Sequence, residues 1–249
     1  MHRPADLIYR YDASWHGFLC CVFESFRCKE LPCSILPLDC PSMSLFPEKE
    51  ISTDSALAQR VAASFPKKLG KSAHRILSTA FLSGQENKEH TLLSFLILAY
   101  QTGPPVFSML GHPLVSAVHQ MQRQVRMEAH QFTGFLRFQD YGEFLGASIQ
   151  PKHQVLPLLA RHFSQRFPGE EFVIYDQTHC TVLFQKQKKL EYAVLEQPPQ
   201  FPSVSRQEVQ WQQLWKQFYN TISIPERENL DLRRNHCPKR FWSNMTEFQ

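Results

Sequence analysis

Residues 126–138 read Arg126-Met-Glu-Ala-His130-Gln-Phe-Thr-Gly-Phe-Leu-Arg137-Phe138, and residues 151–163 read Pro151-Lys-His153-Gln-Val-Leu-Pro-Leu-Leu-Ala-Arg161-His162-Phe163. In both stretches, ionisable residues are set into strongly apolar segments. A segment built only for packing would place its charges toward solvent, because burying an unpaired charge is costly. The pattern predicts that one helix ends, a strand follows and a second helix begins here. Such junctions are where functional sites are often built.

The pattern on either side of this block completes the fold prediction. Apolar spacing predicts helices over 15–26, 55–65, 73–83, 86–101, 113–131, 154–167 and 206–221, and strands over 7–11, 132–139, 143–150, 172–176, 180–185 and 190–194. Residues 29–52 contain four prolines and suggest an extended connection with one strand. Asp140-Tyr-Gly142 is typical of a hairpin turn.

A run of helices followed by paired strands predicts an α+β fold that is helix-rich, with a mainly antiparallel sheet formed by hairpins in the second half. We expect a single domain over residues 1–249. The alternative is a subdivision into a helical half, 1–111, and a helix-plus-hairpin half, 112–249, that ends in a basic tail.

The composition is that of a globular protein, with 43% hydrophobic residues and a net charge of +4. A chain of this length buries about 70% of its extended surface on folding, so it needs no disulfides or structural metals for stability. Seven cysteines, an odd number, indicate free thiols rather than a disulfide scaffold. The spacing of Cys28, Cys33 and Cys40 matches no common metal site, so we expect no metal and no cofactor.

The sequence shows no segment typical of a membrane-spanning helix or of a signal peptide. The longest apolar run, Leu92–Tyr100, is interrupted by Ser94 and is shorter than the roughly 20 residues of a membrane helix. The Met-His-Arg-Pro start lacks the apolar segment of a signal peptide. We therefore expect a cytoplasmic protein.

Common catalytic motifs are also missing. The sequence has no GxxxxGK[ST], GxGxxG, HExxH or GxSxG, and only nine glycines. Nucleotide hydrolases of the usual kind and dinucleotide oxidoreductases are therefore excluded.

Three residues of the opening block are candidates for acid–base catalysis: Glu128, His130 and His153. Glu128 and His130 are two residues apart and would point to different faces of a continuous helix, so they can cooperate only if the helix ends near them. The alternative is a polar cap that satisfies backbone groups at the helix end and in the neighbouring loop.

Basic residues near aromatic ones suggest a nucleic-acid surface, since arginine suits phosphate and aromatic rings stack on bases. The candidates are Arg126, Arg137, Arg161, His162, Arg166, Arg227, Arg233, Arg234, Lys239, Arg240 and Trp242. For the second helix, the alternative is a solvated face. For the tail, it is that Phe241 and Trp242 anchor the terminus while the charges stay in water.

Several motifs in the same order carry a resemblance to a known family. They are Tyr11-Asp-Ala-Ser-Trp-His-Gly17-Phe-Leu-Cys-Cys-Val-Phe-Glu24-Ser, Ala80-Phe-Leu-Ser-Gly84, His112-Pro113 with Val125-Arg-Met-Glu128 through Phe138, Pro151 to His153, His162-Phe with Arg166-Phe-Pro168, and Ile224-Pro-Glu-Arg-Glu-Asn229 with Pro238-Lys-Arg-Phe-Trp242. With these motifs the chain resembles the DUF4130-type bacterial proteins of DNA repair or DNA metabolism.

The resemblance implies an association with a radical S-adenosylmethionine (SAM) DNA-modification protein, beside which members of the family are encoded. Some longer members are fused to a uracil-DNA-glycosylase-like domain. This chain ends at Gln249 and contains neither the GEAPG nor the GQDPYH motif, so we do not expect glycosylase activity. It also lacks the CxxxCxxC cluster motif of a radical enzyme.

Three hypotheses follow. The first is a DNA-binding accessory protein of DNA repair that acts with the radical SAM protein. The second is an enzyme that acts on damaged or modified nucleotides through Glu128, His130 and His153. The third is a protein-interaction scaffold whose basic residues pair with the chain's own carboxylates.

Overall fold

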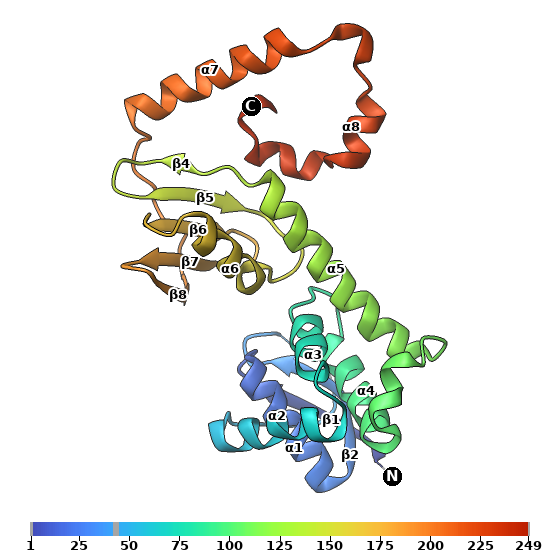
Figure 1. The fold of residues 1–249 in the computed structure, drawn as a ribbon. Helices are drawn as coiled ribbons and strands as arrows, with labels where there is room; N and C mark the ends of the chain where they lie inside the picture. Colours follow the sequence, from blue (N-terminus) through green and yellow to red (C-terminus); the bar gives the residue numbers. More distant parts are fainter. Residues whose placement is uncertain (1, 42–44, 249) are drawn as a thin grey trace. The chain divides into compact units, whose positions relative to one another are not determined.

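A computed structural model describes residues 2–41 and 45–248 of the chain (Figure 1). The chain divides into two compact units, residues 1–125 and 126–249, with the boundary inside the long helix α5, Pro113–Phe135. Helices and strands are both abundant, which confirms the α+β class. In the described part of the chain, no helix is long and apolar enough to cross a membrane.

The first unit contains a small parallel sheet. Strand β1 (Arg3–Tyr11) lies between β2 (Glu30–Pro37) and β3 (Glu48–Glu50), and pairs parallel with both. Helix α1 (Trp15–Cys28) joins β1 to β2, and a helical crossover of this kind brings strands together in parallel. The prediction of one strand in 29–52 is therefore wrong, because this region supplies both neighbours of β1.

Helices complete the first unit: α2 (Ser55–Lys68), α3 (Ala73–Phe81), α4 (Lys88–Thr102) and the short 3₁₀ helix η1 (Pro104–Ser108). Asp54 caps α2 by accepting the N–H groups of Ala56 and Leu57. Phe18, Phe65 and Phe95 lie in the core that these helices share with the sheet.

The second unit contains a five-stranded mixed sheet of order β4-β5-β6-β7-β8. Its elements are β4 (Gln139–Asp140), β5 (Leu145–Ile149), α6 (Leu156–Arg166), β6 (Phe172–Asp176), β7 (Thr181–Lys186) and β8 (Lys189–Val194). The three hairpin pairs are antiparallel, as predicted, whereas β5 and β6 are parallel because α6 joins them. With the parallel first sheet included, a mainly antiparallel arrangement is only partly correct.

Helix α5 extends further than predicted. Residues 132–135 were expected to begin a strand, but α5 continues to Phe135. Phe132 and Phe135, three residues apart on one helix face, both pack against Phe241. This contact with a distant segment favours the helix over the local strand pattern.

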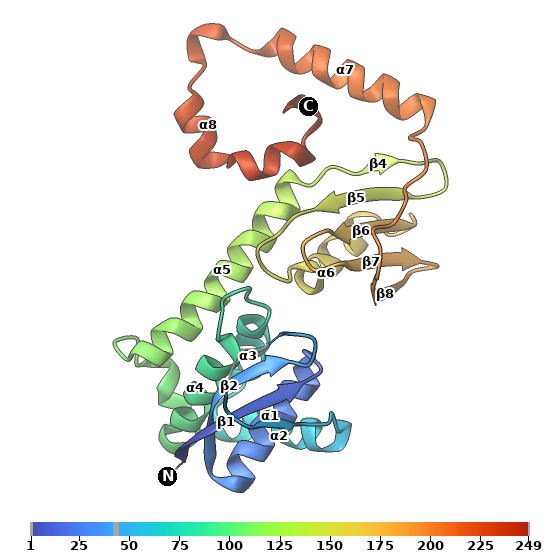
Figure 2. The same cartoon turned by 180° about the vertical axis from the view of Figure 1, so that it is seen from behind.

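The C-terminal segment returns to the β4 side of the sheet in both views (Figures 1 and 2). It consists of α7 (Arg206–Ile222), η2 (Pro225–Arg227), α8 (Leu230–His236), η3 (Lys239–Asn244) and η4 (Thr246–Phe248). The Ser205 N–H donates to the Asp140 carbonyl oxygen and fixes the start of α7 beside β4. Helix α7 contains no buried residue and exposes several large apolar side chains.

Candidate functional site

Glu128 is a buried carboxylate at the meeting point of three segments. On α5, it is only 3% exposed. Oε1 accepts hydrogen bonds from the Lys152 N–H at 3.0 Å and from Arg240 Nη1 at 2.7 Å, and Oε2 accepts one from the His153 N–H at 2.8 Å. Two amides and a guanidinium thus compensate for the burial of the charge. Glu128 joins α5 to the loop before α6 and to η3.

Arg240 completes this joint instead of pointing freely into solvent. Its Nη2 donates to Gln131 Oε1 at 2.9 Å, and its guanidinium lies 4.6 Å from the ring centre of Phe241. Phe241 is buried against α5. Arg240, a candidate for binding phosphate, therefore holds the C-terminal segment on the second unit.

The structure brings together two of the three candidate catalytic residues. His153 follows Lys152 beside Glu128, and burial lowers the pKa of its imidazole, while the Glu128 carboxylate acts in the opposite direction. His130 is exposed on α5. Glu128 and His153 are therefore neighbours, and the His130 side chain is exposed to solvent.

A buried aspartate, Asp176, pairs with the half-buried His179, and the sequence pattern did not predict this pair. The Asp176 side chain, 0% exposed, accepts the N–H groups of Thr178 and His179 through Oδ1. Its Oδ2 lies 2.6 Å from His179 Nδ1. The available signal was the Asp-Gln-Thr-His turn that directly follows strand β6.

A cavity of about 650 Å³ lies between the end of α5, the end of α6 and α7. Two predicted nucleic-acid residues, Arg137 and Arg166, line it. The remaining lining is largely aromatic and aliphatic, with Thr133, Gly134, Leu136, Phe138, Leu145, Phe163, Phe167, Trp215 and Thr246. We call this space the aromatic chamber.

A smaller cavity of about 190 Å³ adjoins it along β4 and β5, and shares Arg137 and Thr246 with the aromatic chamber. Its lining is rich in side-chain amides and hydroxyls, with Gln139, Tyr141, Gly146, Ala147, Ser148, Gln150, Gln177, Ser243 and Asn244. We call it the amide chamber. Together, the two chambers place aromatic rings, arginines and amides in adjoining spaces that meet at Arg137 and Thr246.

The other predicted basic residues are spread over the second unit. Arg233 pairs with Glu228 at 3.2 Å and Arg234 with Asp231 at 3.3 Å, both on the surface. Arg126, Arg161, Arg227 and Lys239 are exposed and have no ion-pair partner among the residues that the structure describes. His162 is half-buried, and its ring lies edge-on to Phe163. None of these side chains lines either chamber.

Trp242 is held within the C-terminal segment. Its indole N–H donates to the Cys237 carbonyl oxygen at 2.8 Å, and its ring stacks on Phe248 with centroids 4.7 Å apart. With Phe241 buried, this matches the alternative in which the two aromatic residues anchor the terminus. The aromatic residue of this segment that reaches the cavity is Trp215 on α7, which was not among the predicted site residues.

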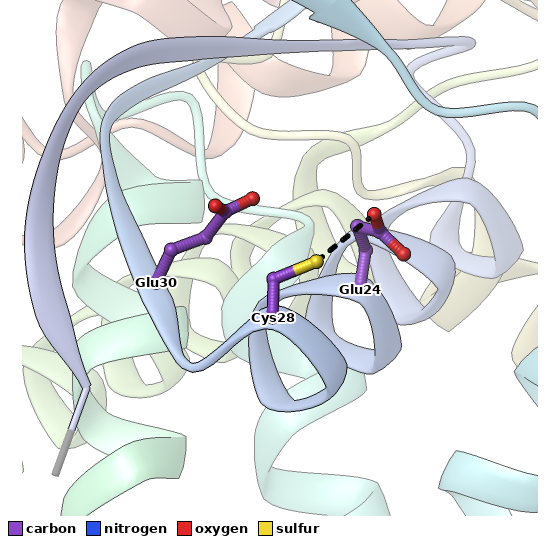
Figure 3. Close-up of side chains that lie close together, drawn as sticks. All are labelled: Glu24, Cys28 and Glu30. Atoms are coloured by element: carbon purple, nitrogen blue, oxygen red, sulfur yellow. Dashed lines mark hydrogen bonds between the residues drawn. The ribbon is translucent and has the colours of Figure 1, made fainter.

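In the first unit, Glu24, Cys28 and Glu30 lie close together (Figure 3). Lys49 Nζ lies 2.7 Å from Glu24 Oε1, 3.0 Å from Glu30 Oε1 and 3.8 Å from Cys28 Sγ. Hydrogen bonds from Arg27, and then from Lys49, lower the pKa of Glu24 to about 2. The Lys49 ammonium and the Arg27 guanidinium therefore supply the positive charge in this group.

Comparison with known protein families identifies the larger part of the chain. The model of a domain of unknown function, DUF4130, matches residues 86–247. The chain belongs to the DUF4130 family. The comparisons with curated proteins and with solved structures found no match.

The DUF4130 region contains all of the second-unit features described above. Both chambers, the Glu128 joint and the Asp176–His179 pair lie within residues 86–247. The Glu24–Cys28–Glu30 group lies outside it. A function shared by DUF4130 domains is therefore to be sought in the second unit.

Proposed function

We propose that this DUF4130 protein binds DNA as an accessory protein of DNA repair or DNA metabolism and acts with a radical SAM DNA-modification protein. The observation that supports DNA binding is the pair Arg137 and Arg166 on one aromatic-lined cavity. Guanidinium groups bind phosphate and aromatic rings stack on bases, so this combination suits a nucleic-acid strand.

The geometry favours binding over catalysis. A general base needs an accessible lone pair, but both Glu128 oxygens accept hydrogen bonds from the protein itself. His130 and His153 line neither chamber. These contacts favour a structural role for Glu128 over acid–base catalysis.

DNA affinity measured against salt concentration tests the proposal. We expect a 12-nucleotide single strand to bind with an affinity that falls steeply as salt rises, because bound phosphates release counterions. Each phosphate contact contributes about 0.7 to the slope of log affinity against log salt on a single strand, so Arg137→Gln with Arg166→Gln removes about 1.4.

The matched control is Arg75→Gln, which removes an exposed arginine of α3 in the first unit. It should leave the slope unchanged. Failure of single- and double-stranded DNA to bind at low salt would overturn the proposal.

The partner is tested separately. The radical SAM protein, purified beside this chain, should be retained on it with and without nuclease treatment. Retention that disappears with nuclease means that DNA alone bridges the two proteins, and it contradicts a direct partnership. Direct retention without DNA affinity is the outcome that the scaffold hypothesis expects.

A further inference from the structure

We propose that the aromatic chamber and the amide chamber form one site for a single unstacked nucleotide of a DNA strand. This inference rests on the proposed DNA binding and specifies its ligand. A nucleotide presents a flat apolar ring, a polar base edge and an anionic phosphate. The two chambers contain a matching group for each of these parts.

The aromatic chamber fits the base ring. Its volume of about 650 Å³ lies in the range of about 300–1,000 Å³ usual for small-molecule sites. Phe138, Phe163 and Phe167 pack edge-to-face or parallel with one another and make up one part of the wall. Trp215 contributes from α7 and is 41% exposed, so part of its indole remains available for stacking.

The amide chamber fits a base edge. Gln150 Nε2 donates to Gln177 Oε1 at 2.5 Å, which leaves the Gln150 carbonyl oxygen as an acceptor and the Gln177 amino group as a donor. Gln139 Oε1 accepts from Tyr141, so its amino group is also available. Adjacent donors and acceptors of this kind are what glutamine and asparagine use to read bases.

Arginine lies where the phosphate is needed. Arg137 lines both chambers and Arg166 lines the aromatic one. Arg137 Nη1 donates to the Gly134 carbonyl oxygen at 2.9 Å, and its Nη2 is 4.0 Å from Glu247 Oε1. That long contact is a weak ion pair, so a phosphate can compete with it for the guanidinium.

An unstacked nucleotide explains these features better than a protein partner on α7 does. The exposed apolar face of α7 includes Trp211, Leu214 and Phe218, which a protein could cover. Such a partner gives no reason for the arginines beside Trp215 in the aromatic chamber or for the paired glutamines in the adjoining amide chamber. A nucleotide requires Trp215 and makes no use of Trp211, which lies outside both chambers.

The experiment compares Trp215→Ala with Trp211→Ala, its matched control one turn earlier on the same helix and 60% exposed. We expect Trp215→Ala to weaken binding of a 12-nucleotide single strand about 5- to 150-fold, the range of one base–aromatic stack. Trp211→Ala should change the affinity less than about twofold. Equal losses in the two variants would overturn the inference, since they indicate a surface that spans the whole helix face.

A third variant separates stacking from folding. The Trp215 indole N–H donates to Glu247 Oε2 at 3.0 Å, so its loss also disturbs η4. Trp215→Phe loses that hydrogen bond but keeps an aromatic ring, and it should retain most of the affinity. If it binds as weakly as Trp215→Ala, the ring is not stacking on a base and the inference is wrong.

The amide chamber is tested by base preference. Gln177→Leu should change the relative affinities for dT, dC and dA strands several-fold and leave the salt slope unchanged. Unchanged preference would remove the amide chamber from the site. These outcomes are distinct from failure of the proposed function, in which no DNA binds and no salt slope exists.

Discussion

At the scale of single residues, Glu128 connects a helix, a loop and the C-terminal segment through one carboxylate. Truncation by Glu128→Ala leaves two amides and the Arg240 guanidinium without this acceptor. Removing one partner of a buried ion pair costs 3–5 kcal/mol, and because Arg240 is partly exposed we expect the lower end, about 3 kcal/mol.

Urea unfolding measures this loss. Glu143→Gln removes an exposed carboxylate from the β4–β5 turn and should change the free energy of unfolding by less than about 0.5 kcal/mol. Equal effects of the two variants would contradict the structural role of Glu128.

His153 makes stability depend on pH. Burial is the main cause that holds its pKa below the ordinary value of 6.5, with Arg240, His179 and Lys152 acting in the same direction and Glu128 opposing. In the window between the lowered folded pKa and 6.5, the unfolded chain binds more protons than the folded one. The free energy of unfolding should therefore fall as pH drops below about 6.5 through this window.

The measurement is urea unfolding of the parent protein and His153→Gln at several pH values from 8 to 5. The variant should show a shallower fall below pH 6.5, because its side chain does not titrate. Parallel curves for the two proteins would assign the pH dependence to other groups.

At the scale of secondary-structure elements, local pattern predicted most helices, and in the second unit it predicted two hairpins and the strand that extends the second of them. The Asp140–Gly142 turn is one example, since Asp140 Oδ1 accepts the Gly142 N–H and Gly142 has a φ of 92°. The local sequence pattern gave the wrong secondary structure where contacts with distant residues determine it. The even-numbered apolar residues Phe132, Leu136 and Phe138 alternate as in a strand, but Phe241, more than a hundred residues later, packs against Phe132 and Phe135 on one face of α5.

The same limit applies to the candidate site. Sequence spacing identified Arg137 and Arg166 as residues suited to phosphate, but not the cavity that they share. Trp215 lies on a helix whose approach to β4 depends on the Ser205–Asp140 hydrogen bond and on contacts with η4. In the sequence, Trp242 is the better aromatic candidate for base stacking because basic residues flank it. In the structure, its indole N–H donates to the Cys237 carbonyl oxygen and its ring stacks on Phe248. Both outcomes depend on tertiary contacts that no local pattern records.

At the scale of the whole molecule, the two units contain different groups of polar and charged residues. The second contains both chambers and the Glu128 joint, and the first contains the lysine-filled Glu24–Cys28–Glu30 group. A nucleotide bound in the chambers contacts the end of α5, the strands β4 and β5, and the segment before η4. It should therefore slow local opening in those segments and leave the first unit unaffected.

Hydrogen exchange with and without a 12-nucleotide single strand measures this directly. We expect slower exchange of amides in residues 133–148 and 243–247, and in the part of α7 around Trp215, because a ligand held by these segments opposes their opening. Exchange within residues 2–41 and 45–125 should stay the same. Arg137→Gln with Arg166→Gln should abolish the protection, while Arg75→Gln should preserve it. Protection centred on the first unit would place the DNA there and separate DNA binding from the two chambers.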